Sequence, residues 1–181
     1  VKKKKPIMYA GMLNKKHRID MLIKGFMNTK NDYELWLFGS GDFEKEIINY
    51  AKIDNRIKFF GRVDREKVLE YEHKASLLIN IRDSKEEYTK YSFPSKTIEY
   101  MASGTPLLTT ELLGIPTEYY DYVYTLDDET EKGLSDKLKE ILSISDNDLA
   151  IQGKKAMDFI LNEKNSKIQG KKIAEFLNKK G

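Results

Sequence analysis

The chain has 181 residues, of which 40% are hydrophobic and 34% are charged, and this length and composition favour one domain, or two very small ones, with a hydrophobic core. Its 32 basic and 29 acidic residues leave a net charge of only +3, so no nucleic-acid partner is expected, and the lysine runs at both ends are expected to be solvated. The absence of cysteine excludes disulfides and thiolate chemistry, the two isolated histidines argue against a metal site, and no apolar run approaches the roughly 18 residues that span a bilayer.

Short apolar segments alternate along the chain with segments that have one apolar face. Strands are predicted at 6–11, 33–39, 56–61, 76–81, 107–109 and 122–126, and the fourth, which is nearly all apolar, is expected at the centre of a sheet. Helices are predicted at 19–27 and 43–51 and at roughly 130–143, 146–162 and 166–179. Two more are expected to begin after Asp64, a plausible cap, and at Pro94, and Ser145 with Asp148 resembles a capping box for the helix at 146–162. This alternation predicts an α/β fold, a Rossmann-like six-stranded parallel sheet between two helical layers.

The carboxyl ends of parallel strands form the edge at which such sheets bind ligands. Gly11, Gly39, Gly61 and the long polar loop 82–92 follow strands at this edge, so we expect them to form the lip of a pocket. The turn from Gly39 to Gly41 would let the backbone approach a ligand, although a tight turn between a strand and a helix also explains it. There is no third glycine at the required offset and no Walker sequence, which argues against hydride transfer with a dinucleotide and against ATP hydrolysis.

The segment 91–110 carries the most specific signal in the chain. Pro94 suits the first helical position, so the amides from Ser95 onwards would point out of a helix N-terminus, which attracts phosphate. Lys96 and Glu99 project from one side of that helix, and Gly104 is expected to end it in the left-handed conformation. Amides and a cation suit a diphosphate, and a carboxylate accepts hydrogen bonds from ribose hydroxyls, so a sugar nucleotide is the indicated ligand. An exposed Lys96–Glu99 ion pair is the alternative.

Basic and aromatic side chains provide two weaker signals. The cluster Lys15-Lys16-His17-Arg18 follows the first strand, where it would either neutralise the charge of a leaving diphosphate or form a solvated loop. The tyrosines at 88, 91, 100, 119 and 120 suit the surroundings of a sugar ring better than a core, although surface tyrosines are ordinary. The aspartates at 20, 42, 64 and 83 are interpreted as caps or turn residues rather than as a catalytic pair.

Four segments are similar to one enzyme family in the same order and spacing. They are 9–13 with 19–26, the Leu-Phe-Gly-Ser-Gly turn at 37–41, 57–63, and 93–106. Together they resemble the donor-binding, C-terminal half of the family 4 (group 1) retaining glycosyltransferases, which have the GT-B fold. The resemblance covers about residues 6–125. It implies a single Rossmann-like nucleotide-sugar-binding domain over 1–181, with 1–5 as a linker and 127–181 as a helical C-terminal part.

The resemblance also implies roles for individual residues. Of the two family glutamates in a Glu-x7-Glu pattern, Glu99 matches the one that binds ribose, whereas Tyr91 stands in place of the one that reaches the donor sugar. The two family cations fall on Met12 and His17, so Lys16, Arg18 or Lys96 is expected to supply the charge, and we expect Lys16 and Lys96 to be the catalytic residues that stabilise the diphosphate. The donor-binding residues implied are Gly11, Met12, His17, Arg18, Gly39, Gly41, Arg62, Val63, Tyr91, Ser92, Phe93, Pro94, Ser95 and Glu99, with Arg62 and Val63 beside the base and 93–95 beside the diphosphate.

The implied reaction transfers a sugar from a UDP- or GDP-sugar to an acceptor hydroxyl, with retained configuration and without a metal or another cofactor. The resemblance implies surface-polysaccharide or glycan biosynthesis on an acceptor glycan or lipid-linked glycan, in the cytoplasm or at the inner face of the membrane. Because the chain starts with Val1, we expect a fragment that lacks an N-terminal acceptor domain and is inactive by itself. A nucleotide-sugar 2-epimerase and a degenerate binding module are the alternatives, and the missing glutamate and arginine favour the second.

Overall fold

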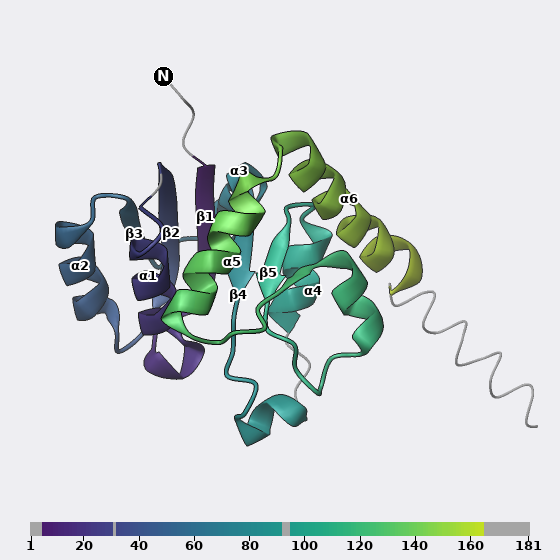
Figure 1. The fold of residues 1–181 in the computed structure, drawn as a ribbon, viewed down its shortest axis with the longest axis horizontal. Helices are drawn as coiled ribbons and strands as arrows, with labels where there is room; N and C mark the ends of the chain where they lie inside the picture. The colour runs from purple at the N-terminus through teal and green to yellow at the C-terminus, as the bar shows by residue number, and fades with distance from the viewer. Residues whose placement is uncertain (1–4, 31, 92–94, 165–181) are drawn as a thin grey trace, which may run out of the picture.

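The computed structural model describes residues 5–30, 32–91 and 95–164. Its six strands form one parallel sheet in the order β3-β2-β1-β4-β5-β6 (Figure 1). The strands are β1 Lys5–Met12, β2 Tyr33–Ser40, β3 Ile57–Gly61, β4 Leu77–Asn80, β5 Leu107–Thr109 and β6 Tyr124–Thr125. The predicted six-stranded parallel sheet is confirmed, and so is the central place of the fourth strand, which lies between β1 and β5. The order reverses between β1 and β4, so a crevice is expected at the carboxyl ends of these two strands.

Helices cover both faces of the sheet, as the predicted three-layer fold requires. One face carries α1 Ile19–Met27, α2 Glu44–Ile53 and α5 Glu131–Ser143, and the other carries α3 Arg65–Lys74, α4 Ser95–Ala102 and α6 Asp146–Glu163. Neighbouring residues of a strand point to opposite faces. In β1, Ile7 and Tyr9 therefore face α1, α2 and α5, whereas Met8 and Ala10 face α3, α4 and α6.

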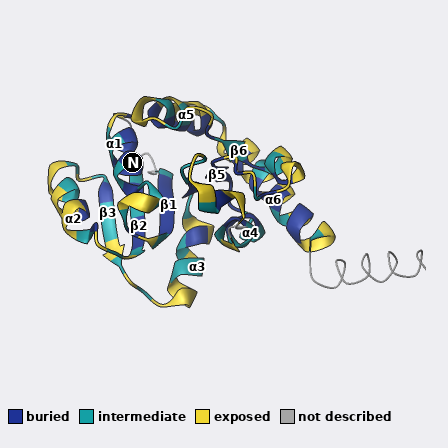
Figure 2. Cartoon of the chain, turned by 90° about the horizontal axis from the view of Figure 1, so that it is seen from below, coloured by how far each residue is buried: buried dark blue, intermediate teal, exposed yellow. Residues whose placement is uncertain are grey.

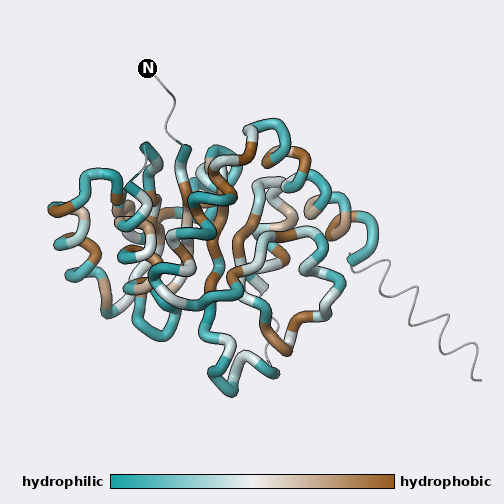
Figure 3. The backbone as a smooth tube through the Cα atoms, in the orientation of Figure 1, coloured by the Kyte–Doolittle hydropathy of each residue, from teal (hydrophilic) through white to brown (hydrophobic). Residues whose placement is uncertain are grey.

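Buried apolar residues form two clusters, one on each face of the sheet. Buried residues follow the strands and the inner sides of the helices, whereas exposed residues lie on the outer sides (Figure 2). The hydrophobic segments run through the centre of the fold (Figure 3). Within the described ranges, no helix is both long and apolar enough to cross a lipid bilayer.

Helix ends agree with most of the sequence predictions. The hydroxyl of Ser145 accepts a hydrogen bond from the Asp148 amide at 3.1 Å, as the predicted capping box requires. Gly104 has φ +79°, the left-handed conformation expected after α4. Asp64 precedes α3 at the cap position, but its side chain makes no capping hydrogen bond, so that detail of the prediction was wrong. The helix predicted at 166–179 lies outside the described residues.

Three short 3-10 helices were not predicted from the sequence: Lys15–His17, Glu87–Lys90 and Thr117–Tyr122. The last of them occupies the start of the strand expected at 122–126 and leaves β6 only two residues long. A hydrogen bond from the Tyr119 amide to the Pro116 carbonyl, 3.1 Å, fixes this tighter turn. The second one shortens the loop 82–92.

Two tyrosines belong to the core, so the expectation that they would be odd there was wrong. Tyr119 is nearly buried, and Tyr100 has no exposed surface. The Tyr100 hydroxyl accepts a hydrogen bond from the Ala10 amide at 2.8 Å and donates one to the Ala10 carbonyl at 3.2 Å. A tyrosine can be fully buried when its hydroxyl is paired in this way. The bonds dock α4 against β1 near its carboxyl end.

Candidate functional site

Helix α4 is held at the carboxyl ends of the central strands by buried polar contacts. Besides the bonds of Tyr100, the Asn80 side-chain amide at the end of β4 donates to the Thr97 hydroxyl at 3.0 Å. Thr97, Tyr100 and Met101 are all buried against the sheet. Lys96 and Glu99 lie between these anchors on the helical turn and are only partly buried, so the fold presents both at the rim.

A cavity of about 310 Å³ at this rim brings together six of the predicted site residues. Those six are Gly11 and Gly39 at the ends of β1 and β2, Arg62 and Val63 after β3, and Lys96 and Glu99 on α4. Ala10, Phe38, Arg65 and Val68 complete the lining. The cavity therefore lies where the sequence predicted a ligand, at the carboxyl edge beside the switch in strand order.

Gly39 is a structural requirement of this rim. It pairs with Gly11 in the register of β1 and β2, and its φ of +125° lies in the region that favours glycine. A Cβ atom at Gly39 would lie 1.8 Å from the Gly11 carbonyl oxygen. Gly41 does not line the cavity; its amide donates to the Glu44 carboxylate at 2.9 Å, which agrees with the alternative of a tight turn.

Two cations surround the carboxylate of Glu99. Lys96 Nζ lies 2.8 Å from its Oε1 and Arg65 Nη2 lies 3.2 Å from its Oε2. Burial by itself would raise the pKa of Glu99, but the hydrogen bond and charge of Lys96 and the charge of Arg65 lower this pKa below its usual value. Glu99 is therefore ionised at neutral pH, and the ion pair of the alternative interpretation exists within the cavity itself.

Arg65 was missed by the sequence analysis. It is the first residue of α3, on the strand-to-helix connection that was already assigned to the rim. A basic residue directly after Asp64 was therefore the available signal. With Arg65, the cavity contains three arginine or lysine residues and one carboxylate, a combination that suits an anionic ligand with hydroxyl groups.

The basic cluster at 15–18 does not line this cavity. Arg18 contacts Asp83 at 3.3 Å and donates to the Glu129 carbonyl at 2.9 Å, in a separate cavity of about 420 Å³. Lys16 Nζ lies 4.3 Å from the centre of the Tyr88 ring. Of the three candidates for the missing charge, Lys96 alone lies on the cavity.

His17 carries no charge at neutral pH. Burial, with the charges of Arg82 and Lys16, lowers the pKa of His17 to about 4. Its Nδ1 lies 2.6 Å from the Asn14 side-chain oxygen, which orients the ring. His17 therefore cannot neutralise a diphosphate by its charge in this conformation.

Of the remaining predicted residues, Met12, Tyr91 and Ser95 do not line the cavity. Met12 and Tyr91 are exposed, Tyr91 to 83%. Ser95 begins α4 and is exposed beside the cavity. The residues 92–94 lie outside the described residues, so the contact predicted between their amides and the diphosphate stays a prediction.

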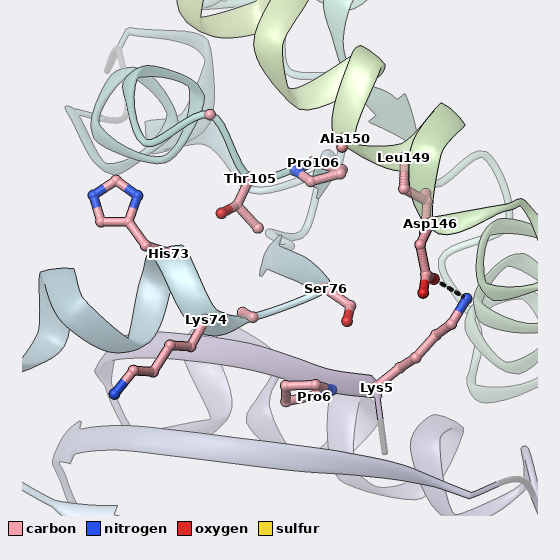
Figure 4. A pocket seen from close by; sticks show the side chains of 12 residues that line it. Lys5, Pro6, His73, Lys74, Ser76, Thr105, Pro106, Asp146, Leu149 and Ala150 are labelled. Carbon is pink, nitrogen blue, oxygen red and sulfur yellow. Dashed lines mark ion pairs between the residues drawn. The ribbon is translucent and has the colours of Figure 1, made fainter. Parts of the chain in front are cut away.

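A cavity of about 480 Å³ opens at the opposite edge of the sheet (Figure 4). It lies beside Pro6 and Pro106, at the amino ends of β1 and β5, and Lys5 pairs with Asp146 across it at 2.6 Å. None of the predicted site residues that the structure describes lines it. In the described part of the chain, no group of three or more His, Cys, Asp or Glu side chains is placed to hold a metal ion.

Comparison with known proteins gives one family and several similar structures. The model of the family described as "Glycosyl transferases group 1" matches residues 4–144. The Alr3699/HepE structure from Anabaena, solved in complex with UDP and glucose, has a TM-score of 0.77 at 16% identity, over 97% of this chain and 48% of that one. The catalytic domain of cholesterol-α-glucosyltransferase from Helicobacter pylori has a TM-score of 0.67 at 19% identity, and the match covers 86% of this chain and 98% of that one.

A variant of TarM from S. aureus, solved with UDP among its ligands, has a TM-score of 0.72 at 16% identity, over 94% of this chain and 35% of that one. At these identities the similarity concerns the fold. The chain spans about half of the Anabaena protein. No protein with a curated description matches the sequence.

Proposed function

Because the chain belongs to the group 1 glycosyl transferases, we propose that it is the nucleotide-sugar-binding half of a retaining enzyme that transfers a sugar from a UDP- or GDP-sugar to an acceptor hydroxyl. The observation that carries this proposal is the cavity at the carboxyl edge of the sheet, where Glu99 lies between Lys96 and Arg65. A sugar nucleotide has the two groups that such a cavity can distinguish, a diphosphate and a vicinal diol.

Glu99, Lys96 and Arg65 each have a role in this proposal. Glu99 accepts hydrogen bonds from the two ribose hydroxyls, and the cations that it now holds turn towards the diphosphate. Lys96 then lies where negative charge grows as the bond between sugar and diphosphate breaks, and stabilises the leaving group. The backbone at Arg62 and Val63 lies beside the base. Protein cations supply the positive charge, so the proposal includes no metal or other cofactor.

The acceptor site belongs to a part of the protein outside this chain. Since the chain covers 48% of the Anabaena structure, we place the acceptor in a separate domain that precedes residue 1. The proposal assigns to the whole enzyme an acceptor glycan or lipid-linked glycan, a role in polysaccharide biosynthesis, and a location in the cytoplasm or at the inner membrane face. This half alone would bind the donor without transferring its sugar.

One observation favours a second candidate function, a binding module without catalysis. Tyr91 replaces the family's sugar-binding glutamate and is exposed outside the cavity. Calorimetry of the 181-residue chain with UDP, GDP and their sugar conjugates tests both functions. Binding of one base series, with the sugar conjugate tighter than the bare nucleotide, supports the donor-binding role. Equal affinities for the nucleotide and its conjugate favour the module, and no binding at millimolar concentration contradicts both.

A further inference from the structure

Glu72, on the inner side of α3, is a buried carboxyl group that the proposed roles do not use. Its side chain has no exposed surface, and no donor in the described part of the chain reaches either of its oxygens. Its backbone is fixed, because the Thr105 hydroxyl donates to the Glu72 carbonyl at 2.7 Å. An ionised carboxylate buried without a donor costs several kcal/mol, so a proton on Glu72 is the favoured state.

The neighbour that can accept this proton is Glu99. Both residues line a cavity of about 450 Å³ between α3 and α4, adjacent to the donor cavity, and their carboxyl groups are within hydrogen-bond reach. Two ionised carboxylates would repel each other and would have no proton to share. Because Lys96 and Arg65 stabilise the charge of Glu99, the proton belongs on Glu72.

The electrostatics of the pair agree with this assignment. Burial raises the pKa of Glu72 to about 7, and the charge of Glu99 acts in the same direction. The pKa of Glu99 is lowered by its cations, as described above. The pair therefore carries one negative charge below about pH 7 and two above it.

We propose that Glu72 is a positioning residue for the donor: its protonated carboxyl donates a hydrogen bond to Glu99 and holds that carboxylate in the orientation that accepts the ribose hydroxyls. This inference rests on the proposed function, since it takes Glu99 as the ribose ligand. It adds a proton-controlled step to donor binding that the residues of the donor cavity do not provide by themselves.

The groups that face Glu72 determine the expected pH dependence. Among the described residues, the cations that act on Glu72 are Arg65 and Lys96, and the ionised carboxylate beside it is Glu99; Tyr100 stays neutral, because burial raises its pKa well above the usual value. The summed charge of Arg65, Lys96, Glu99 and Glu72 is +1 when Glu72 is protonated and zero when Glu72 is ionised. A diphosphate therefore binds more tightly to the protonated form, and binding near pH 7 takes up a proton.

His73 needs a control, because the side chain of this exposed histidine also lines the cavity. The variant His73→Gln removes the imidazole from the cavity and leaves the carboxyl pair unchanged. Glu70→Gln is the matched control for the loss of a carboxyl group on α3, since Glu70 is exposed, pairs with Lys67 and Lys74, and does not line either cavity.

The test is calorimetry of the 181-residue chain with UDP-glucose or GDP-mannose from about pH 6 to 8.5, in pairs of buffers that differ in ionisation enthalpy. The diphosphate of these conjugates stays fully ionised over this range, so a proton taken up must come to the protein. As the pH rises over this range, the affinity of the unchanged chain, of His73→Gln and of Glu70→Gln should each fall about three- to tenfold. Binding near pH 7 should take up a proton in all three.

Glu72→Gln separates a positioning role from a structural one. Its amide donates the same hydrogen bond at every pH, so we expect tight binding across the range and no proton uptake, whereas Glu72→Met should bind weakly at every pH. If Glu72→Gln keeps the pH dependence and the proton uptake of the unchanged chain, the titrating group lies elsewhere and the inference is overturned.

A ligand-free measurement distinguishes failure of this inference from failure of the proposed function. If neither conjugate binds, the proposed function fails, but the carboxyl 13C resonance of Glu72, assigned by its loss in Glu72→Gln, still reports the proton. We expect this resonance to titrate near pH 7 and its midpoint to move lower in Glu99→Gln. A midpoint between about pH 4 and 5, the ordinary range of glutamate, would overturn proton sharing whatever the nucleotide result.

Discussion

Replacement of Glu99 by alanine should weaken nucleotide binding through the ribose and not through the diphosphate. A carboxylate that accepts hydrogen bonds from ribose hydroxyls contributes about 1.5–3 kcal/mol, so Glu99→Ala should bind UDP or GDP about 10- to 150-fold more weakly. The same change frees Lys96 and Arg65 from ion pairs of 2.8 and 3.2 Å. Binding of inorganic pyrophosphate, which has no ribose, should therefore stay constant or become tighter.

The fold should tolerate this substitution. The Lys96 and Glu99 side chains are 28% and 22% exposed, and an ion pair at three-residue spacing on a helix contributes only about 0.3–0.5 kcal/mol. A loss of affinity in a variant that still unfolds in one cooperative transition well above the assay temperature would then report on the ligand contact. Glu70→Ala is the control, because it removes an exposed carboxylate from the neighbouring helix without touching the cavity.

A double-mutant cycle by calorimetry gives the decisive comparison. The unchanged chain and Glu99→Ala are each titrated with the nucleoside diphosphate and with its 2′,3′-dideoxy analogue. We expect the unchanged chain to lose affinity for the analogue, Glu99→Ala to bind both alike, and a coupling free energy of about 1.5–3 kcal/mol. A coupling energy near zero would refute the assignment of Glu99 to the ribose, even if the alanine variant bound more weakly overall.

Four further predictions test the architecture and the charges. Gly39→Ala should lower the free energy of unfolding in urea by about 2 kcal/mol or more, because its Cβ would lie 1.8 Å from a backbone oxygen at a φ of +125°. Tyr100→Phe should lower the melting temperature through a loss of about 1–3 kcal/mol, since it leaves buried backbone groups of β1 unpaired. Lys96→Met should weaken pyrophosphate binding severalfold, whereas Lys16→Met, outside the cavity, should not change it. The pKa of Glu72 is raised to about 7 in the folded state, so between about pH 4.5 and 7 the folded state binds a proton that the unfolded state has lost. The free energy of unfolding should therefore fall by at most about 3 kcal/mol as the pH rises through this interval. Denaturation of Glu72→Gln should not show this fall.

The strands and most helices could be predicted because their signals are local. The run from Leu77 to Asn80 is continuous and apolar, as a strand buried on both faces requires, and it proved central. The two-residue β6 and the 3-10 helix Thr117–Tyr122 could not be predicted with the same accuracy. Both depend on contacts with distant segments, β6 with β5 and the 3-10 helix with α6, and such contacts leave no periodic pattern in the sequence.

The rim of the site could be predicted from topology. Gly11, Gly39 and Arg62 follow three different strands, and parallel strands bring their carboxyl ends to one edge, where the cavity now includes all three. The basic cluster at 15–18 was assigned to the same edge by the same rule. It does not line the cavity, because Arg18 is engaged by acidic groups at 83 and 129 that are remote in sequence.

Burial of polar groups was the part that sequence reasoning missed. Tyr100 finds its hydrogen-bond partner at Ala10, ninety positions away, and no local pattern reports that distance. Glu72 left a usable signal, since it follows Val68 by four positions and so lies on the inner side of α3. A glutamate at such a position predicts either a buried partner or a buried proton.

The most direct test of the central claim is a crystal structure of the chain with a bound UDP- or GDP-sugar. We predict that both ribose hydroxyls lie within hydrogen-bond distance of the Glu99 carboxylate and that the diphosphate lies beside Lys96 at the start of α4. A nucleotide bound in the cavity at the opposite edge of the sheet, or a ribose turned away from Glu99, would contradict the account.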